Sequence, residues 1–505
     1  MKNTFNFDRQ RINEIQQTIV KNKSFLFSLI FISILYALPL ILANTYYVDD
    51  LNRTVAGYAW DHDGRYVSSA IMHLLSFQSD VVFSLYPFSM MAGSVILSLS
   101  GFIFTYSLGV RNKTFLFAGS LLLTTCPFLL EILAYRFDSI PISLSVLFIT
   151  LPFLFFDNRK HFFIASIVGI FLSLGLYQTT ALSYCIITCI FLIKDVWNER
   201  YKKGLFTVLW SAIAFLSAFF IYKIVLDFLD LELLQDQRGD FIFKDAHLFQ
   251  LLKDRFHGMI DLVKLLFKSS YKFVFLLLLF VNLISLVVYF RTNTKKIINK
   301  QLPLKMVLVV LILFFIAIFT AGINMFVYEP RWVPRAMIGW GFATHLFFFP
   351  LLLNTKYRNL LLSFALIPFV FYSFVLSSQL GVYLKNQDDF SDYIINLVSP
   401  KLLEHDRIKV IIKGTNKTAH RNITVNYNTM PIIYKLAPIY ENNDWGWGII
   451  RLNKFDNISS VYIGGEERNE ILKNIAAYPI ADRNIYYTLR IKDDIAIIDF
   501  ERGEE

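Results

Sequence analysis

The sequence predicts an all-α polytopic membrane bundle of about 11 transmembrane helices, with a small C-terminal α/β domain outside the membrane. Of the 505 residues, 55% are hydrophobic and only 17% are charged, whereas a soluble domain has about 25% charged residues. After Lys385 the composition returns to that of a soluble protein. We therefore expect a membrane domain over residues 1–384 and a separate α/β domain over residues 385–505.

Apolar runs long enough to cross about 30 Å of hydrocarbon recur along the first domain. The first run follows a polar stretch and lacks a small-residue cleavage site, so it predicts a retained helix. The fifth and sixth are broken only by Gln178, Thr179 and Thr180, which leaves open whether both cross. The runs are 25–43, 83–108, 114–134, 139–156, 162–177, 179–193, 205–226, 273–290, 306–326, 336–353 and 360–376.

Basic residues predict the orientation of these runs. They precede the first run and then gather in alternate loops, at 111–113, 159–160, 194–203, 291–305 and 356–358. The positive-inside rule makes those loops and the N-terminus cytoplasmic. Segments 46–66, 135–138, 229–272, 328–335 and the tail then lie on the outer face. Because the net charge of +10 collects in topogenic loops, it indicates no nucleic-acid partner.

The outer segments have their own patterns. The cytoplasmic loops are short and contain no glycine-rich phosphate loop, so we expect the chemistry on the outer face without a bound nucleotide. From Leu248, apolar residues recur at helical spacing opposite a polar stripe, which predicts a helix in the interface plane. A connector and a substrate gate are equally open roles for it. In the tail, 408–412, 461–463, 486–491 and 495–500 predict strands and 466–477 predicts a helix.

Segment 46–66 concentrates charge just after the first apolar run. It contains Asp49, Asp50 and Arg53, and later Asp61, Asp63 and Arg65. Carboxylates are stabilised in the first turn of a helix, so a polar helix start is one interpretation of the Asp pair. The other is a general base at the outer interface, where a carboxylate can take a proton from a hydroxyl group.

Arginines in the other short outer segments need an explanation, because such segments are usually poor in Lys and Arg. Arg136 lies beside Asp138, with Glu131 one turn earlier, and Arg331 and Arg335 lie close together. Arginine binds phosphate in a bidentate manner, which suits a lipid phosphate at the interface. The alternative is interfacial ion pairing with nearby carboxylates. Both stay open for Arg331 and Arg335, and ion pairing is favoured for Arg136.

A carboxylate near a phosphate-binding arginine matches the needs of sugar transfer from a lipid phosphate. The acceptor hydroxyl must lose a proton, while a phosphate leaving group needs charge stabilisation more than an acid. Asp49 and Asp50 could also hold a divalent cation, but no third acidic ligand lies at a useful spacing. Metal-dependent and metal-independent chemistry both stay open. Gln178 and Trp60 are candidates for sugar contact, although packing is favoured for each.

The first outer segment begins with Asp49-Asp50-Leu51-x-Arg53 and continues with Gly57-Tyr58-x-Trp60 and Gly64-Arg65. This order resembles the first periplasmic loop of the serotype-converting O-antigen glucosyltransferases, the bacterial and prophage Gtr family of type II. The 135–138 turn and the break at Tyr177-Gln178 are also similar to that family. The resemblance covers most of the membrane region and does not extend to the tail.

The resemblance implies an enzyme of the GT-C superfamily in the bacterial inner membrane. Its donor would be undecaprenyl phosphate glucose, and its acceptor a sugar of lipid-linked O-antigen or lipopolysaccharide on the periplasmic face. Transfer would be inverting and would cause serotype conversion. The base would be Asp49 or Asp50, without a choice between them. The substrate-binding candidates are Arg53, Trp60, Arg65, Arg136, Asp138, Gln178, Arg331 and Arg335. The N-terminus would be cytoplasmic and the C-terminal domain periplasmic, where it would help to select the acceptor.

Two other classes of protein remain as alternatives. A transporter or flippase for a lipid-linked sugar would have ionisable residues deep in the membrane and repeated halves. Glu131 is the best candidate for such a residue, and it lies near the end of a run. An O-antigen polymerase or ligase would depend on arginines in large middle loops, and its Asp pair would be incidental. The glucosyltransferase is favoured over both.

Overall fold

The computed structural model describes residues 23–231, 233, 240–297, 301–348, 358–405, 407–422, 429–443, 446–452 and 460–501. It divides into two compact units. The membrane unit consists of Met1–Ile41 and Tyr58–Ser378, and the C-terminal unit consists of Leu42–Gly57 and Gln379–Glu505. The predicted boundary near residue 384 stays a prediction, and the assignment of Leu42–Gly57 was not anticipated.

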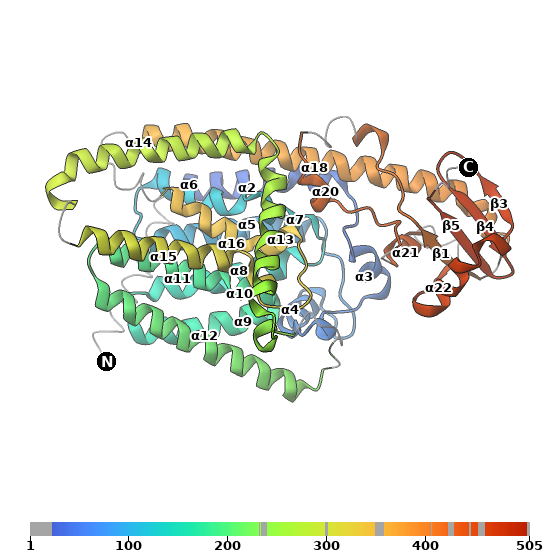
Figure 1. Ribbon diagram of the computed structural model, residues 1–505, viewed down its shortest axis with the longest axis horizontal. Helices are drawn as coiled ribbons and strands as arrows, with labels where there is room; N and C mark the ends of the chain where they lie inside the picture. Colours follow the sequence, from blue (N-terminus) through green and yellow to red (C-terminus); the bar gives the residue numbers. More distant parts are fainter. Residues whose placement is uncertain are drawn as a thin grey trace. The chain divides into compact units, whose positions relative to one another are not determined.

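Helices make up the membrane unit (Figure 1). In chain order they are α2 (Lys23–Ala43), α4 (Tyr66–Ser76), α5 (Phe88–Ser107), α6 (Lys113–Thr124), α7 (Leu130–Ala134), α8 (Ser139–Thr150), α9 (Arg159–Leu176), α10 (Gln178–Ala181), α11 (Ser183–Trp197), α12 (Tyr201–Leu229), α13 (Leu248–Phe267), α14 (Tyr271–Ile297), α15 (Leu302–Thr320), α16 (Ile338–Ala343) and α18 (Arg358–Leu402), whose C-terminal part belongs to the other unit.

Eight of the described helices are long and apolar enough to cross a membrane, and a ninth span results if the bent pair α6 and 127–134 is counted as one. These agree with the first, second, fifth to ninth and eleventh predicted runs, and the bent pair with the third. The fourth run forms the shorter apolar helix Ser139–Phe155. The tenth extends into residues 349–353, which lie outside the described residues. The chain is therefore a multi-pass membrane protein, and the count of eleven crossings stays a prediction.

Small residues bring the central helices together. A Cβ added at Gly119 of α6 would lie 2.1 Å from Thr105 Oγ1 of α5, so no larger residue fits there. Ser98 of α5 bonds to Thr124 of α6 at 2.6 Å and also to Ser33 of α2. Helices in lipid associate through such close contacts and interhelical hydrogen bonds, since lipid tails are as apolar as the side chains.

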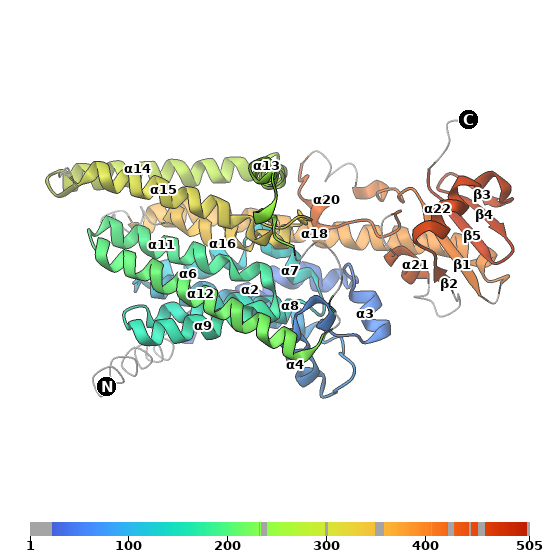
Figure 2. The same ribbon diagram turned by 60° about the horizontal axis from the view of Figure 1, so that its bottom comes forward.

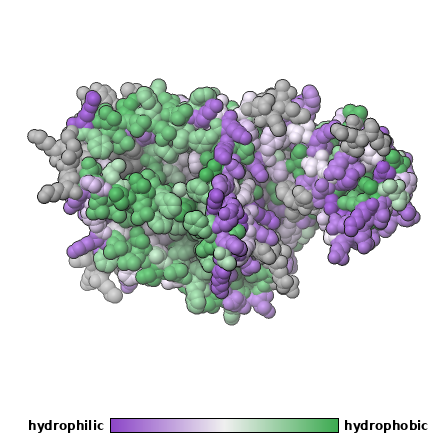
Figure 3. All heavy atoms as spheres, viewed as in Figure 1, coloured by the Kyte–Doolittle hydropathy of each residue, from purple (hydrophilic) through white to green (hydrophobic). Residues whose placement is uncertain are grey.

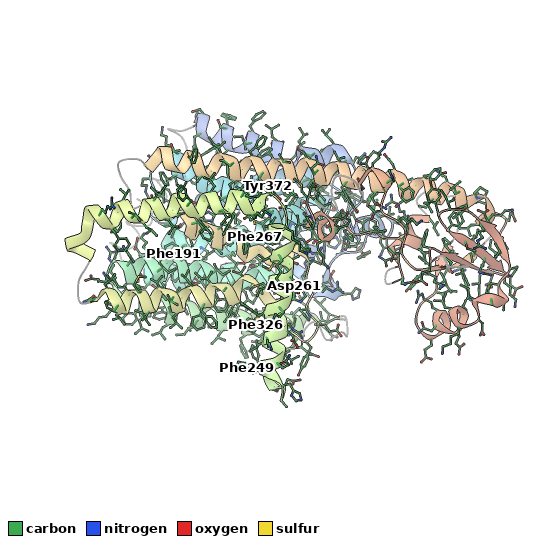
Figure 4. The ribbon with its side chains drawn as sticks, turned by 45° about the horizontal axis from the view of Figure 1, so that its top comes forward. Phe191, Phe249, Asp261, Phe267, Phe326 and Tyr372 are labelled. Atoms are coloured by element: carbon green, nitrogen blue, oxygen red, sulfur yellow. The ribbon has the colours of Figure 1, made fainter. Side chains whose placement is uncertain are left out.

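The amphipathic helix predicted from Leu248 is confirmed as α13. It crosses the direction of α14 and α15, as both ribbon views show (Figures 1 and 2). Hydrophilic residues gather along it, beside the hydrophobic surface of the neighbouring long helices (Figure 3). Leu262 and Leu266 are buried, whereas Phe249 is 87% exposed. Figure 4 shows Phe249, Asp261 and Phe267 along this helix. An exposed Phe on a helix with one polar face is typical of an interfacial position.

A five-stranded mixed sheet forms the centre of the C-terminal unit, in the order β2-β1-β5-β4-β3. Strand β1 (Ile408–Lys413) is parallel to β2 (Ser460–Tyr462) and β5 (Ile495–Asp499), whereas β4 (Thr488–Lys492) is antiparallel to β5 and β3 (Ile480–Arg483). The four predicted strands and the helix α22 (Gly465–Lys473) are confirmed within a few residues. Ile394, Val398 and Leu402 at the end of α18 pack against the sheet.

A short turn joins the last two strands. Strand β4 ends at Lys492 and β5 begins at Ile495. Asp493 between them has a φ of 55°, a conformation that Asp tolerates better than most residues. The C-terminal unit also contains the short helices α3 (Asp50–Ala56), α20 (Ile433–Leu436) and α21 (Trp447–Leu452).

Candidate functional site

The 135–138 turn joins α7 to α8, and its four residues are all buried. Its residues contact different parts of the membrane unit. Phe137 packs in a cluster with Trp60, and the guanidinium carbon of Arg136 lies 4.4 Å from the centre of the Tyr86 ring. The turn is therefore a fixed part of the core and holds its polar side chains in defined places.

Asp138 lies at the centre of a buried polar cluster. Its Oδ1 accepts a hydrogen bond from Arg65 Nη2, and its Oδ2 lies 3.4 Å from Trp60 Nε1. Arg65 Nε also donates to the carbonyl oxygen of Leu176, at 2.7 Å, and the guanidinium lies over the Tyr177 ring at 5.2 Å. The structure thus brings together three sequence-predicted residues, Trp60, Arg65 and Asp138. Because each polar group has partners, this cluster is built like a structural ion pair.

Gln178 joins the same region through the backbone of the first segment. Its Nε2 donates to the carbonyl oxygen of Asp63 at 2.8 Å and to the Tyr222 hydroxyl at 3.2 Å. Tyr222 in turn donates to the carbonyl oxygen of Gly64 at 3.0 Å. A Cβ at Gly64, where φ is 69°, would lie 2.9 Å from that hydroxyl. The break between α9 and α11 therefore holds the turn that carries Arg65.

Arg335 forms a second ion pair, with Glu131 of α7. Its backbone N–H donates to Glu131 Oε2 at 2.7 Å, and its Nη1 donates to Glu131 Oε1 and to the Tyr135 hydroxyl. Glu131 is only 2% exposed. The predicted deep carboxylate is therefore paired across 204 residues of sequence, which is how buried charges are tolerated near lipid.

Arg331 differs from the other arginines of the site. Its backbone is held on both sides by Asn324, which accepts from Arg331 N–H at 3.1 Å and donates to Arg331 O at 2.6 Å. Its side chain is exposed. Among the residues that the structure describes, no ion pair or hydrogen bond of its guanidinium is recorded. It is therefore a positive charge on a fixed backbone, available to a ligand.

Helix α13 holds the loop that carries Arg331. Arg255 of this helix donates to the carbonyl oxygens of Val327, at 3.2 Å, and Tyr328, at 2.6 Å. The Trp332 ring packs directly on Gly258, where an added Cβ would lie 2.4 Å from Trp332 Nε1. The helix thus contacts the loop on both sides of Arg331.

A further hydrogen bond holds the start of this loop. The Tyr328 hydroxyl donates to Asp245 Oδ2 at 2.9 Å. The His247 backbone N–H, and then the Tyr328 hydroxyl, lower the pKa of Asp245 below its usual range. Asp245 therefore stays ionised, as an acceptor, at neutral pH.

Asp49, Asp50 and Arg53 lie in the C-terminal unit. Asp50 is the first residue of α3 and is 1% exposed; its Oδ2 accepts a hydrogen bond from Tyr47 N–H at 3.2 Å. Asp49 precedes the helix, and its Oδ2 lies 2.8 Å from Arg53 Nη2. The Asp49 side chain is 22% exposed, so it is the more accessible of the two carboxylates.

The structure also shows residues that the sequence did not single out. Asn324, Arg255 and Gly258 hold the Arg331 loop, and Tyr222 holds the turn before Arg65. Local periodicity carried no signal for these contacts, because most of them join segments that are far apart in the chain. In the described part of the chain, no group of three or more His, Cys, Asp or Glu side chains could hold a metal ion.

The model of a family described as glucosyl transferase GtrII matches residues 38–346, more than half of the 505 residues and a range that includes every candidate residue. The chain is also 26% identical over 462 residues to an "uncharacterized 55.3 kDa protein in gtrB 5' region" of Salmonella phage P22, a match that covers 84% of this chain and 88% of the phage protein. No solved structure matches the chain.

The family match decides between the classes of protein that the sequence left open. It favours glycosyl transfer over lipid-sugar transport. The chain therefore belongs to the glucosyl transferase GtrII family and is a membrane glycosyltransferase.

Proposed function

We propose that this enzyme transfers glucose from undecaprenyl phosphate glucose to a sugar of the O-antigen repeat unit on the periplasmic face of the inner membrane, with inversion, and so causes serotype conversion. Membership of a glucosyl transferase family supports the sugar and the reaction class. The lipid-phosphate donor, the acceptor and the face of the membrane rest on the sequence resemblance and on the positive-inside pattern. The acceptor is lipid-linked O-antigen or lipopolysaccharide.

The observation that carries the proposal is the available guanidinium of Arg331. A structural arginine near a membrane interface normally pairs with a carboxylate, as Arg65 and Arg335 do. Arg331 has no such partner among the described residues, although its backbone is fixed by Asn324. A fixed arginine can bind a phosphate through two N–H groups and stabilise the charge that develops as the phosphate leaves.

We assign the general base to Asp49 rather than Asp50. The base must reach the acceptor hydroxyl, and Asp49 keeps a partly exposed carboxylate while it pairs with Arg53. Asp50 is almost fully buried and bonds to the backbone of its own turn, which suits a structural role. Direct displacement at the anomeric carbon by the activated hydroxyl forms one glycosidic bond, breaks the sugar–phosphate bond and leaves the lipid phosphate as an anion.

Transfer of labelled glucose from undecaprenyl phosphate glucose to lipid-linked O-antigen tests this proposal. We expect Asp49→Asn to lower kcat by about 10²- to 10⁴-fold, the usual contribution of a general base. The assay uses membranes with matched amounts of wild type, Asp49→Asn and Asp50→Asn, each with and without a chelator. If the chelator abolishes transfer by the wild type, the reaction depends on a metal ion. Asp49 is then assigned as a ligand of that ion and not as the base.

Asp63→Asn is the matched control. Asp63 lies in the same segment, is exposed, and uses only its backbone oxygen in its recorded bond to Gln178. We expect it to transfer glucose at the wild-type rate. Normal transfer by both Asp49→Asn and Asp50→Asn would show that the base does not lie in this segment, and would contradict the assignment of Asp49.

A further inference from the structure

The turn that leads into the Asp pair has an unfavourable backbone. Asp50 N–H donates to the carbonyl oxygen of Tyr47 at 3.0 Å, which closes a four-residue turn. Val48 occupies the first central position with a φ of 49°, where turns normally place Gly, Asn or Asp. For a β-branched residue this conformation is a genuine outlier, and it persists only where surrounding contacts hold it.

The contacts that hold this turn come from the polar tail of the same unit. Val48 N–H donates to the Tyr440 hydroxyl oxygen at 2.9 Å, and the Tyr47 hydroxyl donates to the carbonyl oxygen of Leu436 at 2.5 Å. Desolvation raises the pKa of Tyr440 above its usual range, and the bond from Val48 opposes this only in part. The hydroxyl therefore stays neutral and protonated under the conditions in which the enzyme works.

Tyr440 is held in turn by a charged cluster that joins its own segment to α18 and α21. The next residue, Glu441, is 4% exposed, and its Oε2 accepts from Ser391 Oγ of α18 at 2.9 Å. Arg451 lies 3.6 Å from Glu441 Oε1 and donates to the Asp388 carboxylate, also on α18. A continuous chain of contacts thus leads from α18 through Glu441 to the Tyr440 hydroxyl. Separating buried charges that are paired in this way is unfavourable, so the ion pairs keep Glu441 beside α18.

We propose that Tyr440 is a positioning residue for the Asp49–Asp50 pair, and that the C-terminal unit holds Val48 in its strained conformation so that the Asp49 carboxylate is oriented for catalysis. This inference rests on the proposed role of Asp49 as the base. It gives the tail a role in the reaction itself, in addition to any selection of the acceptor. Misplacement of a catalytic group by about 1 Å can cost as much as 10²-fold in rate.

The proposed support of the Val48 turn by Tyr440 can be tested without an assay of glucose transfer. Hydrogen exchange of the detergent-solubilised full chain is followed in peptides that cover residues 44–57. We expect Tyr440→Phe to make the Val48 amide exchange about tenfold faster, as the loss of one hydrogen bond implies. Tyr487→Phe is the matched control, because it removes another tyrosine hydroxyl bond of the same unit, to Asp482 at 2.8 Å, and should leave these peptides unchanged.

The catalytic half is tested by steady-state transfer. We expect Tyr440→Phe to lower kcat by about 10- to 100-fold with little change in KM for either substrate, and Tyr487→Phe to keep the wild-type kcat. Val48→Gly in the Tyr440→Phe background should recover part of kcat, because glycine adopts a positive φ without steric cost. If Tyr440→Phe does not accumulate, Tyr47→Phe removes the other bond of the turn and carries the same two expectations.

The possible results separate this inference from the proposed function. Faster exchange with a lower kcat supports it. Unchanged exchange in Tyr440→Phe overturns it, and so does faster exchange with a normal kcat while Asp49→Asn is inactive. If Asp49→Asn and Asp50→Asn are both fully active, the proposed base is wrong; the catalytic role of Tyr440 is then overturned with it, and only the exchange result stands.

Discussion

Asp138 and Arg65 form a buried ion pair that affects both the stability of the fold and the position of the turn after Trp60. Their side chains are only 6% and 10% exposed, and they lie 73 residues apart in the sequence. Taking both charges out of water is unfavourable, so the pair stabilises the fold only while each charge has its partner. The pair also fixes the turn that follows Trp60, through the Leu176 carbonyl oxygen.

We expect Asp138→Asn to lower the free energy of unfolding by about 3–5 kcal/mol, since it leaves Arg65 buried without its countercharge. The double variant Arg65→Met with Asp138→Leu should recover most of this loss, because apolar residues of similar size replace buried pairs at little cost. The thermal midpoint of the detergent-solubilised chain measures both effects.

The exposed pair of Asp261 and Lys264 provides the control for this prediction. Its side chains are 69% and 62% exposed, so Asp261→Asn should change the midpoint little. Glucose transfer by the stable double variant then identifies the role of the buried pair. Transfer at the wild-type rate would contradict the substrate-binding role predicted for Arg65 and Asp138.

At the scale of the element, different parts of α13 have different surroundings. One face contacts the 328–335 loop through Arg255 and Gly258. The end of the helix exposes Phe249. These contacts show a helix that supports the loop carrying Arg331, and the choice between a connector and a substrate gate stays open. A gating motion stays a prediction.

We expect Gly258→Ala to impair transfer through the loop, without any change in charge. The added Cβ would overlap Trp332, so the loop must move or the helix must shift, and overpacking of this kind costs about 1–3 kcal/mol. KM for undecaprenyl phosphate glucose should rise, as it should in Arg331→Ala, because both changes weaken phosphate binding. His257→Ala, at the exposed neighbouring position of α13, should keep the wild-type KM. A normal KM for undecaprenyl phosphate glucose in Gly258→Ala would show that the contact between α13 and the loop does not affect donor binding.

At the scale of the whole molecule, the two compact units do not follow the chain order. Leu42–Gly57 lies between two parts of the membrane unit in sequence but belongs to the C-terminal unit. Helix α3 has only seven residues, too few to be stable in water without tertiary contacts. The tail therefore supplies the contacts that the Asp pair needs for a defined structure.

A chain that ends at Leu402 is expected to lose transfer at least as completely as Tyr440→Phe does, although it keeps all candidate membrane spans of the described residues and both Asp residues. It lacks Leu436 and Tyr440, the hydrogen-bond partners of the turn at Val48. Residues 42–57 should then become sensitive to limited proteolysis. A chain that ends at Glu501 is the control and should behave as the wild type. Full transfer by the chain ending at Leu402 would show that the Asp pair needs no support from the tail.

Much of the architecture follows from local patterns in the sequence. Lipid requires long apolar helices, and a surface between lipid and water requires an amphipathic one, so the spans and α13 could be predicted from periodicity. The strands at 408–412 and 495–500 were evident because they are buried and rich in Ile and Val. Strand β3 (Ile480–Arg483) was missed, since it lies at the edge of the sheet and is mostly exposed, which leaves no apolar pattern.

The sequence by itself determined that this is a membrane protein, where most of its helices lie and the residue types of the candidate site. Only the tertiary structure decided which charges meet: Asp138 with Arg65, Glu131 with Arg335, and Arg331 with no described partner. It also assigned the Asp pair to the C-terminal unit. The physical reason is that hydrophobic periodicity is a local property of the chain, whereas pairing of buried charges depends on contacts between segments up to 204 residues apart, which leave no trace in local composition.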